Sequence, residues 1–218
     1  MANIAAHLSA TMHVITPTHP GFGGTVRPDG LRTPGQLAML YLGLLDDLGL
    51  TGITVIGNSV GGWIAAEMAV AGSGRLKGVV LVDAVGIEVP GHPVAEFFSL
   101  TLDQVAEFSY HEPDKFRIDP AKVPPAQLAA MPGNRAALAV YGGKMVDVAL
   151  KDRLSAVSLP VLVLWGESDR IVDPEYGRAL AAAIPNARFE LLEGTGHVPQ
   201  VETPELLASR IGDFAVSI

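Results

Sequence analysis

The sequence predicts an α/β fold, in which helices cover both faces of a mostly parallel β-sheet and a helical insertion interrupts the order of strands. Short runs of β-branched and apolar residues alternate with amphipathic segments, as is typical of a sheet built from strand–helix units. Residues 79–82 are continuously apolar, as expected of a strand covered on both faces. The alternation stops between residues 86 and 152 and resumes at residue 161.

Each expected element depends on a local pattern. Strands are expected where four or five β-branched or apolar residues lie between turn residues, and helices where apolar residues recur three or four positions apart. On this basis we expect strands at 13–16, 53–57, 79–82, 161–165 and 188–192. Helices are expected at about 3–10, 34–48, 60–71, 136–150, 174–184 and 203–214.

The helix near residue 34 has a strong start signal. Thr33 followed by Pro34 is typical of a helix cap with proline in the first turn. The apolar side chains after it, from Leu37 to Leu48, recur so that one face of the helix stays apolar. We therefore expect this helix to pack against the sheet.

The segment 86–152 differs from the rest of the chain. It carries clustered prolines at 120, 124, 125 and 132, together with short helical pieces. This pattern favours an inserted lid rather than a second sheet domain. We therefore expect a core formed by residues 1–85 and 153–218 and a cap formed by residues 86–152.

Composition excludes several classes of protein. The formal net charge of −8 argues against nucleic acid and anionic membrane surfaces as partners. The absence of cysteine excludes disulfides, thiolate metal sites and a cysteine nucleophile. No apolar run approaches the roughly 18 residues of a membrane span, and the N-terminus lacks the layout of a secretory signal, so we expect a cytoplasmic protein.

No cofactor or metal is expected either. The glycines at 21–24 fit neither a dinucleotide fingerprint nor a phosphate loop, and no lysine follows Gly62 as a Walker motif would need. The histidines at 7, 13, 92 and 111 show no metal-ligand spacing.

Three polar residues follow three of the expected strands. Ser59 follows the strand at 53–57, Asp169 follows the strand at 161–165, and His197 follows the strand at 188–192. Because parallel strands share a direction, all three side chains are expected at one edge of the sheet. The order Ser, Asp, His, with Ser59 inside Gly-Asn-Ser-Val-Gly, is that of a nucleophile elbow and its triad.

The chemistry explains why these residue types occur together. A serine hydroxyl is a poor nucleophile until a base removes its proton, a role that suits His197. Asp169 would fix the tautomer of that imidazole and stabilise its protonated form. The backbone N–H of Val60, at the start of the next helix, is expected to stabilise an oxyanion, a contribution worth about 3 kcal/mol of barrier.

Two further residues have weaker claims. Asp83 follows the strand at 79–82 and is an alternative acid, although packing or capping explains it as well. His19 is expected near the edge of the site, where it could contact substrate. The substrate-binding residues themselves are not predicted, because the irregular insertion would form them.

These motifs resemble those of the α/β-hydrolase family, and the resemblance covers nearly the whole chain. The segment Pro-Gly-Phe-Gly-Gly-Thr at 20–25 resembles the family's P-G-F-G-x-S turn, and residues 57–62 resemble its nucleophile elbow. Gly-Glu-Ser-Asp at 166–169 is similar to the acid loop, and Gly196-His197 with the helix behind it to the base loop. The resemblance implies hydrolysis without a cofactor and a cap, at 86–152, that shapes the substrate pocket.

The chain departs from the family at its beginning. Members normally start with two or three additional strands, and a His-Gly loop there supplies a second oxyanion N–H. We expect an N-terminal truncation, a complementing chain that supplies the strands, or a rearranged sheet, and we favour the first. Without a strand between 13–16 and 53–57, unpaired backbone groups would cost about 1–3 kcal/mol each. The sequence also leaves open a homo-oligomer.

Three functions are compatible with these observations. The leading interpretation is a serine hydrolase that cleaves a small or medium carboxylic ester through an acyl-enzyme. The second is a carbon–carbon bond hydrolase of ring-fission products, whose elbow Gly-Asn-Ser-x-Gly-Gly resembles residues 57–62, although Val198 stands where those enzymes tend to carry tryptophan. The third is a catalytically silent protein that kept the triad but lost the oxyanion loop.

Overall fold

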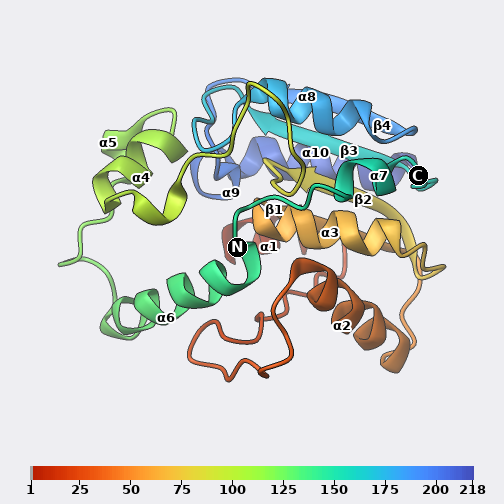
Figure 1. Ribbon diagram of the computed structural model, residues 1–218, viewed down its shortest axis with the longest axis horizontal. Helices are drawn as coiled ribbons and strands as arrows, with labels where there is room; N and C mark the ends of the chain where they lie inside the picture. The colour runs from red at the N-terminus through yellow and green to blue at the C-terminus, as the bar shows by residue number, and fades with distance from the viewer. Residues whose placement is uncertain (1) are drawn as a thin grey trace.

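The computed structural model describes residues 2–218 and contains a four-stranded, fully parallel sheet (Figure 1). Its strands lie in chain order, so each new strand is added to the same side of the sheet. The predicted parallel sheet is confirmed. The strands are β1 (Ile53–Asn58), β2 (Leu76–Val82), β3 (Val161–Gly166) and β4 (Ala187–Leu192).

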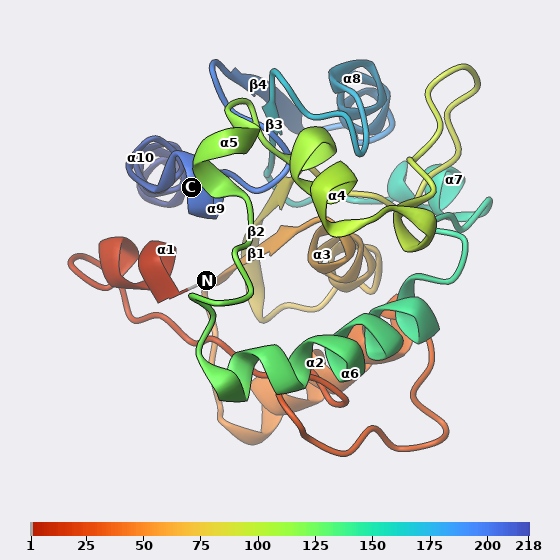
Figure 2. The same cartoon turned by 90° about the vertical axis from the view of Figure 1, so that its left-hand side faces the viewer.

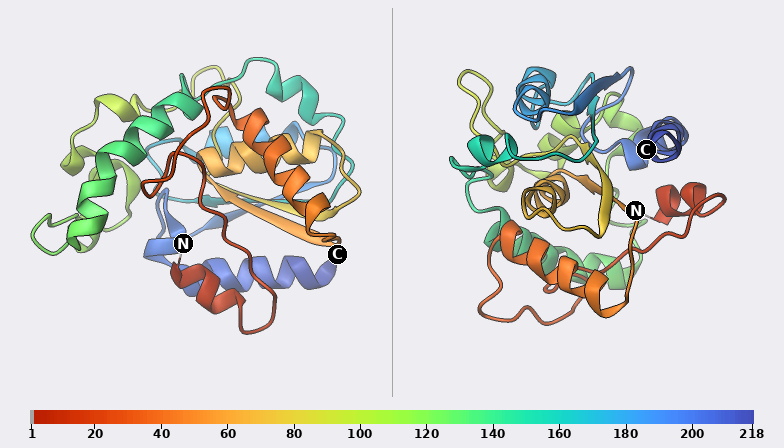
Figure 3. Two further views of the ribbon diagram at one scale, coloured as in Figure 1. Left: turned by 90° about the horizontal axis from the view of Figure 1, so that it is seen from below. Right: turned by 90° about the vertical axis from the view of Figure 1, so that its right-hand side faces the viewer.

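Helices cover both faces of this sheet. α2 (Pro34–Asp47), α3 (Val60–Val70) and α8 (Pro174–Ala182) lie on one face. α1 (Ala2–Leu8), α9 (Pro199–Glu202) and α10 (Pro204–Ser217) lie on the other face, where α1 packs beside α10 (Figures 2 and 3). The structure is thus a three-layered α/β arrangement, as the alternation of strands and helices predicts.

The two inner strands show why their sequences are continuously apolar. Val79 and Leu81 of β2 belong to the core beneath α2 and α3, whereas Val80 and Val82 belong to the core beneath α1 and α10. Successive side chains of a strand point to opposite faces, so a strand covered on both faces must be apolar at every position. Residues 79–82 are at most 1% exposed.

The start of α2 also forms as predicted. The Thr33 hydroxyl accepts a hydrogen bond from the Gln36 N–H, and the Gln36 side chain accepts one from the Thr33 N–H, which is a complete capping box. Pro34 occupies the first turn of the helix. Leu37 of α2 is fully buried in the core between α2, α3 and the sheet.

The strand expected at 13–16 does not form. These residues have no regular secondary structure, Ile15 is 45% exposed, and β1 is the edge strand of the sheet. A β-branched run becomes a strand only when a neighbouring strand supplies hydrogen-bond partners, and none among residues 2–218 pairs with this segment. The strand predicted at 13–16 was therefore wrong.

The segment 86–152 contains several helices, of which α4 (Leu102–Ser109), α5 (Pro113–Phe116) and α6 (Pro125–Gly142) lie beside one end of the sheet (Figure 1). Its other elements are the 3₁₀ helix η1 (Phe97–Ser99) and α7 (Leu150–Leu154), which begins near the end of the segment and packs against α3. The helix expected at 136–150 was wrong at its end, because α6 stops at Gly142 and Gly143 and Met145 adopt positive φ values. Treating residues 86–152 as a separate cap remains a proposal.

Within residues 2–218, none of the helices has both the length and the apolar character that crossing a bilayer would require.

Candidate active site

Ser59 lies on a sharp turn between β1 and α3. Its backbone has φ 55° and ψ −121°, a conformation that residues other than glycine rarely adopt. A Cβ added at Gly57 would lie 2.0 Å from the carbonyl oxygen of Gly61, and one added at Gly62 would lie 2.4 Å from the Ala84 Cβ. Two of the glycines around Ser59 are therefore required for close packing, whereas a Cβ at Gly61 would meet open space.

The Ser59 side chain does not cap the helix that follows it. Although Ser59 occupies the N-cap position of α3, its hydroxyl makes no capping hydrogen bond. Because α3 begins at Val60, the Val60 N–H has no acceptor inside the helix and lies at the positive end of the helix dipole. This placement suits the oxyanion role predicted for Val60, which stays a prediction.

Asp169 is held in a buried loop after β3. Its Oδ1 accepts hydrogen bonds from the N–H groups of Ile171 (2.8 Å) and Val172 (3.1 Å), and the residue is 3% exposed. A Cβ at Gly166 would lie 2.1 Å from the carbonyl oxygen of Gly196, so this loop and the loop that carries His197 pack backbone against backbone. The absence of a side chain at Gly166 thus allows the two loops to meet.

His197 contacts Asp169 directly. The distance between His197 Nδ1 and Asp169 Oδ2 is 2.7 Å, and both side chains are buried. The backbone of His197 is also anchored, since its N–H donates to the Ser109 carbonyl at 2.7 Å and its carbonyl accepts from Asn58 Nδ2 at 2.9 Å. With Nδ1 bonded to Asp169, Nε2 is the ring nitrogen that remains for proton transfer.

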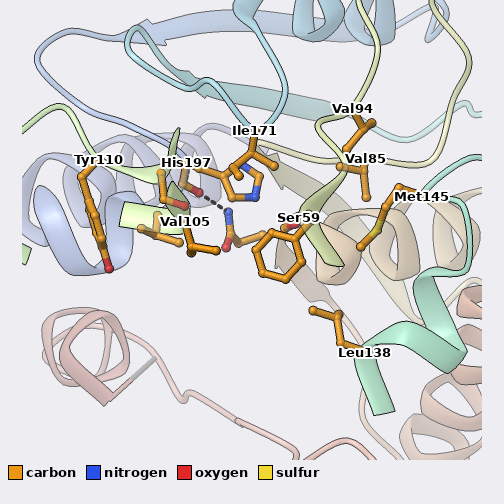
Figure 4. A pocket seen from close by; sticks show the side chains of 13 residues that line it. Ser59, Val85, Val94, Val105, Tyr110, Leu138, Met145, Ile171 and His197 are labelled. Atoms are coloured by element: carbon orange, nitrogen blue, oxygen red, sulfur yellow. Dashed lines mark hydrogen bonds between the residues drawn. The ribbon is translucent and has the colours of Figure 1, made fainter. Parts of the chain in front are cut away.

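Ser59 and His197 line the same cavity, which has a volume of about 220 Å³ (Figure 4). In Figure 4 the His197 ring extends toward Ser59. Among residues 2–218, no hydrogen bond joins the Ser59 hydroxyl to that ring; such bonds are often long before substrate binds. The structure thus pairs Asp169 with His197 and places Ser59 on the wall that His197 faces.

The remaining wall of the cavity is mostly apolar, and the sequence did not predict its residues. Most come from η1, α4, α6 and the loops of the segment 86–152, which has no simple periodic pattern, and the others come from the end of β1 and the loops after β2, β3 and β4. The only available signal was the insertion itself. The lining side chains other than Ser59 and His197 are Asn58, Val85, Val94, Phe97, Val105, Ser109, Tyr110, Leu138, Met145, Ile171 and Val198.

The C-terminal end of α4 joins the two loops that carry Asp169 and His197. The Phe108 carbonyl accepts a hydrogen bond from the Arg170 N–H at 3.0 Å, and the neighbouring Ser109 carbonyl accepts from the His197 N–H. Residues of the segment 86–152 therefore help to place the buried Asp169–His197 pair, in addition to lining the cavity.

Glu202, at the end of α9, fastens the same region. One carboxylate oxygen accepts hydrogen bonds from the N–H groups of His111 (2.8 Å) and Glu112 (3.1 Å), and the other accepts from the Gly196 N–H (2.7 Å). Its negative charge, after burial, contributes to raising the pKa of the Tyr110 hydroxyl. Sequence reasoning missed this role, because nothing local indicates which loops a glutamate will reach.

Glu202→Ala is expected to lower the free energy of unfolding by about 1–3 kcal/mol, because the partly buried Gly196 N–H loses its acceptor and the exposed N–H groups of His111 and Glu112 lose theirs. Denaturant unfolding measures the effect. Glu205→Ala is the matched control, since Glu205 is exposed and its one ion pair is with His7. Equal stability of the Glu202 and Glu205 variants would contradict this reading of the contacts.

Neither of the two weaker candidates lines the cavity, although Asp83 lies close to Asp169 and His197. His19 is absent from the cavity wall; its Nδ1 bonds to the Tyr41 hydroxyl, and burial lowers the pKa of His19. Asp83 is fully buried. His197 Nδ1 bonds to Asp169 and not to Asp83, so the geometry favours Asp169 as the acid. The substrate contact expected of His19 is thus not supported by its position.

Residues 1–210 match the model of a protein family described as the alpha/beta hydrolase family. The chain is 28% identical to the 2-hydroxymuconate semialdehyde hydrolase of Pseudomonas putida, over 94% of this chain and 78% of that protein. It is 27% identical to Lipase 3 of Moraxella sp. (strain TA144), over 87% of this chain and 65% of that protein. The chain therefore spans about two thirds to four fifths of these relatives.

The fold also matches solved structures. A thermophilic esterase from Thermogutta terrifontis superimposes with a TM-score of 0.75 at 28% identity, covering 99% of this chain and 85% of that one. The fold of this chain is therefore similar to that of the esterase.

Proposed function

Because the chain belongs to the alpha/beta hydrolase family and is a hydrolase, we propose that it cleaves small carboxylic esters with Ser59 as nucleophile, His197 as base and Asp169 as the acid that orients the base. The observation that carries this proposal is the convergence of Ser59 and the buried Asp169–His197 pair on one cavity. Cleavage would proceed through an acyl-enzyme, and no cofactor or metal is part of it.

The proposed reaction has two steps. His197 Nε2 takes the Ser59 proton while the hydroxyl oxygen attacks the ester carbonyl, and the same proton then passes to the departing alcohol. A water molecule, deprotonated by His197, then attacks the acyl-enzyme, and His197 returns that proton to the departing Ser59 oxygen as the carboxylic acid is released. The Val60 N–H is suited to stabilise the oxyanion that forms in each step.

The cavity favours an uncharged substrate. Its volume of about 220 Å³ lies below the range of roughly 300–1,000 Å³ that is common for ligand pockets, which supports a short acyl chain. No arginine or lysine occurs among the described residues that line it. A carboxylate buried there would lose its hydration without gaining a cationic partner, which is strongly unfavourable.

The alternative is a carbon–carbon bond hydrolase, which the similarity to 2-hydroxymuconate semialdehyde hydrolase favours. The substrate in that name carries a carboxylate group. The apolar wall of the cavity therefore argues for the ester reading, although the elbow residues suit both reactions.

A substrate comparison tests the proposal. We expect the kcat/KM for p-nitrophenyl acetate or butyrate to exceed that for 2-hydroxymuconate semialdehyde by about 100-fold, equivalent to roughly 2.7 kcal/mol of barrier. Initial rates measured spectrophotometrically give both values. The p-nitrophenyl ester of a long fatty acid serves as the control for chain length. Faster turnover of 2-hydroxymuconate semialdehyde than of the short esters would contradict the proposal and favour the carbon–carbon bond hydrolase.

A fluorophosphonate probe separates an active hydrolase from a catalytically silent relative. Covalent labelling of Ser59 in the folded protein requires an activated hydroxyl. Folded protein that remains unlabelled would favour the silent reading. A cytoplasmic location, a homo-oligomer and a complementing chain remain separate predictions from the sequence.

A further inference from the structure

Asp83 is a buried carboxyl group that the proposed reaction does not use. It directly follows β2, is 0% exposed, and has a backbone φ of 45°. Residues other than glycine rarely adopt such a positive φ, and the surrounding structure must hold them there. A charged or polar side chain in this position therefore calls for a physical explanation.

Only one of the two Asp83 side-chain oxygens has a hydrogen-bond donor. Asp83 Oδ1 accepts from the Gly166 N–H at 2.7 Å. Asp83 Oδ2 is buried and has no donor among residues 2–218. An ionised carboxylate with such an unsatisfied oxygen is strongly disfavoured away from water.

The groups closest to Asp83 belong to the proposed catalytic machinery. One side-chain oxygen of Asp83, one of Asp169 and a ring nitrogen of His197 lie within 4.8 Å of one another. Burial, followed by the negative charge of Asp169, raises the pKa of Asp83 well above its usual range, whereas the Gly166 N–H acts in the opposite direction. A side-chain hydrogen bond between Asp83 and Asp169 is a further cause that raises the pKa of Asp83.

The two carboxyls cannot share that hydrogen bond if both are ionised, because neither then has a proton to donate. Protonation of Asp83 at Oδ2 resolves the conflict, because that oxygen then no longer lacks a donor and its hydroxyl can itself donate. We propose that Asp83 is a neutral carboxylic acid whose hydroxyl donates a hydrogen bond to the Asp169 carboxylate and so positions Asp169 for His197. The inference rests on the proposed function, because positioning Asp169 matters for catalysis only if His197 is the base of the hydrolysis.

The arrangement makes Asp83 a positioning residue that acts through Asp169. Asp169 already accepts from the Ile171 and Val172 N–H groups and from His197 Nδ1. An additional donor from Asp83 fixes the carboxylate plane and disperses its charge. It thereby weakens the pull of Asp169 on the proton of His197.

Infrared spectroscopy tests the protonation state directly. At about pH 8, exposed carboxyl groups are ionised, so a carboxylic-acid C=O band must come from a buried, protonated group. We expect this band in the native protein and its loss in Asp83→Asn. Its absence from the native protein, or its persistence in the variant, overturns the proposal, and neither result depends on enzymatic activity.

Titration of the His197 ring tests the positioning role. We expect its midpoint, followed by NMR with labelled histidine, to move up by about 0.5–1 pH unit in Asp83→Ala, because Asp169 loses a donor. Asp83→Asn should restore the native midpoint, since the amide NH₂ replaces the hydroxyl donor while its oxygen keeps the Gly166 N–H. Asp213→Ala removes an exposed carboxylate and controls for net charge.

The alternatives give different results. If Asp83 were ionised, both variants would remove a negative charge near His197 and shift the midpoint down. If Asp83 were only structural, neither variant would shift it. If Asp83→Ala does not fold, Asp83→Leu, which also lacks a donor, replaces it in the titration, and the infrared band still reports the protonation state. Fluorophosphonate labelling of Ser59 in native protein separately reports on the proposed function, so the two failures are distinguishable.

Discussion

Ser59→Ala is expected to reduce kcat/KM for short p-nitrophenyl esters by about a million-fold and to abolish fluorophosphonate labelling. The reason is that the Asp169–His197 pair is proposed to activate the Ser59 hydroxyl, and the variant lacks that hydroxyl. Because the Ser59 hydroxyl makes no capping hydrogen bond, its removal should leave the fold intact. Initial-rate kinetics and mass spectrometry of the labelled protein measure the two effects.

The control for Ser59→Ala is Ser155→Ala. Ser155 is exposed and lies outside the cavity wall, so the same deletion of a hydroxyl should leave both hydrolysis and labelling at the native level. A thermal unfolding curve for each variant excludes loss of structure as the cause. Native turnover by Ser59→Ala would refute the serine mechanism and with it the proposed function.

Gly57→Ala is expected to lower the free energy of unfolding by about 3 kcal/mol and to abolish activity. The added Cβ would lie 2.0 Å from the carbonyl oxygen of Gly61 and 2.7 Å from the nitrogen of Gly62. Both are backbone atoms, so the clash can be relieved only by displacing the start of α3. That displacement would also move Ser59 and the Val60 N–H away from the cavity. Denaturant unfolding and ester hydrolysis measure the two losses.

Gly61→Ala is the matched control, because a Cβ at this position meets nothing within 4 Å. Gly61 lies in α3, where alanine is favoured over glycine by roughly 0.5–1 kcal/mol. We therefore expect this variant to be at least as stable as the native protein. Similar stabilities of the two variants would show that the turn around Ser59 is not held by the close packing described here.

The strands of the sheet could be predicted from the sequence because their signals are local. Residues 79–82 are apolar at every position, and this pattern alone indicates a strand covered on both faces. The start of α2 at Thr33 and Pro34 is local in the same way. Residues 13–16 have a comparable β-branched pattern but form no strand, because pairing depends on a neighbour that the segment's own residues cannot supply.

The candidate site was predictable in part. The parallel direction of the strands explains why Ser59, Asp169 and His197 were expected at one edge, and the structure brings Asp169 and His197 into contact there. That these three residues carry out catalysis remains a prediction. The cavity wall was not predictable, since its side chains come from short helices and loops whose packing no periodicity describes.

The sequence by itself determined the parallel α/β architecture and the positions after the strands at which the polar residues stand, because alternating hydrophobicity and turn residues act over a few neighbouring positions. Only the tertiary structure decided that β1 is an edge strand, that Glu202 fastens the His197 loop, and that Asp83 lies buried beside Asp169. Each of these depends on contacts between segments that are distant along the chain. Such contacts arise only when the whole core packs together.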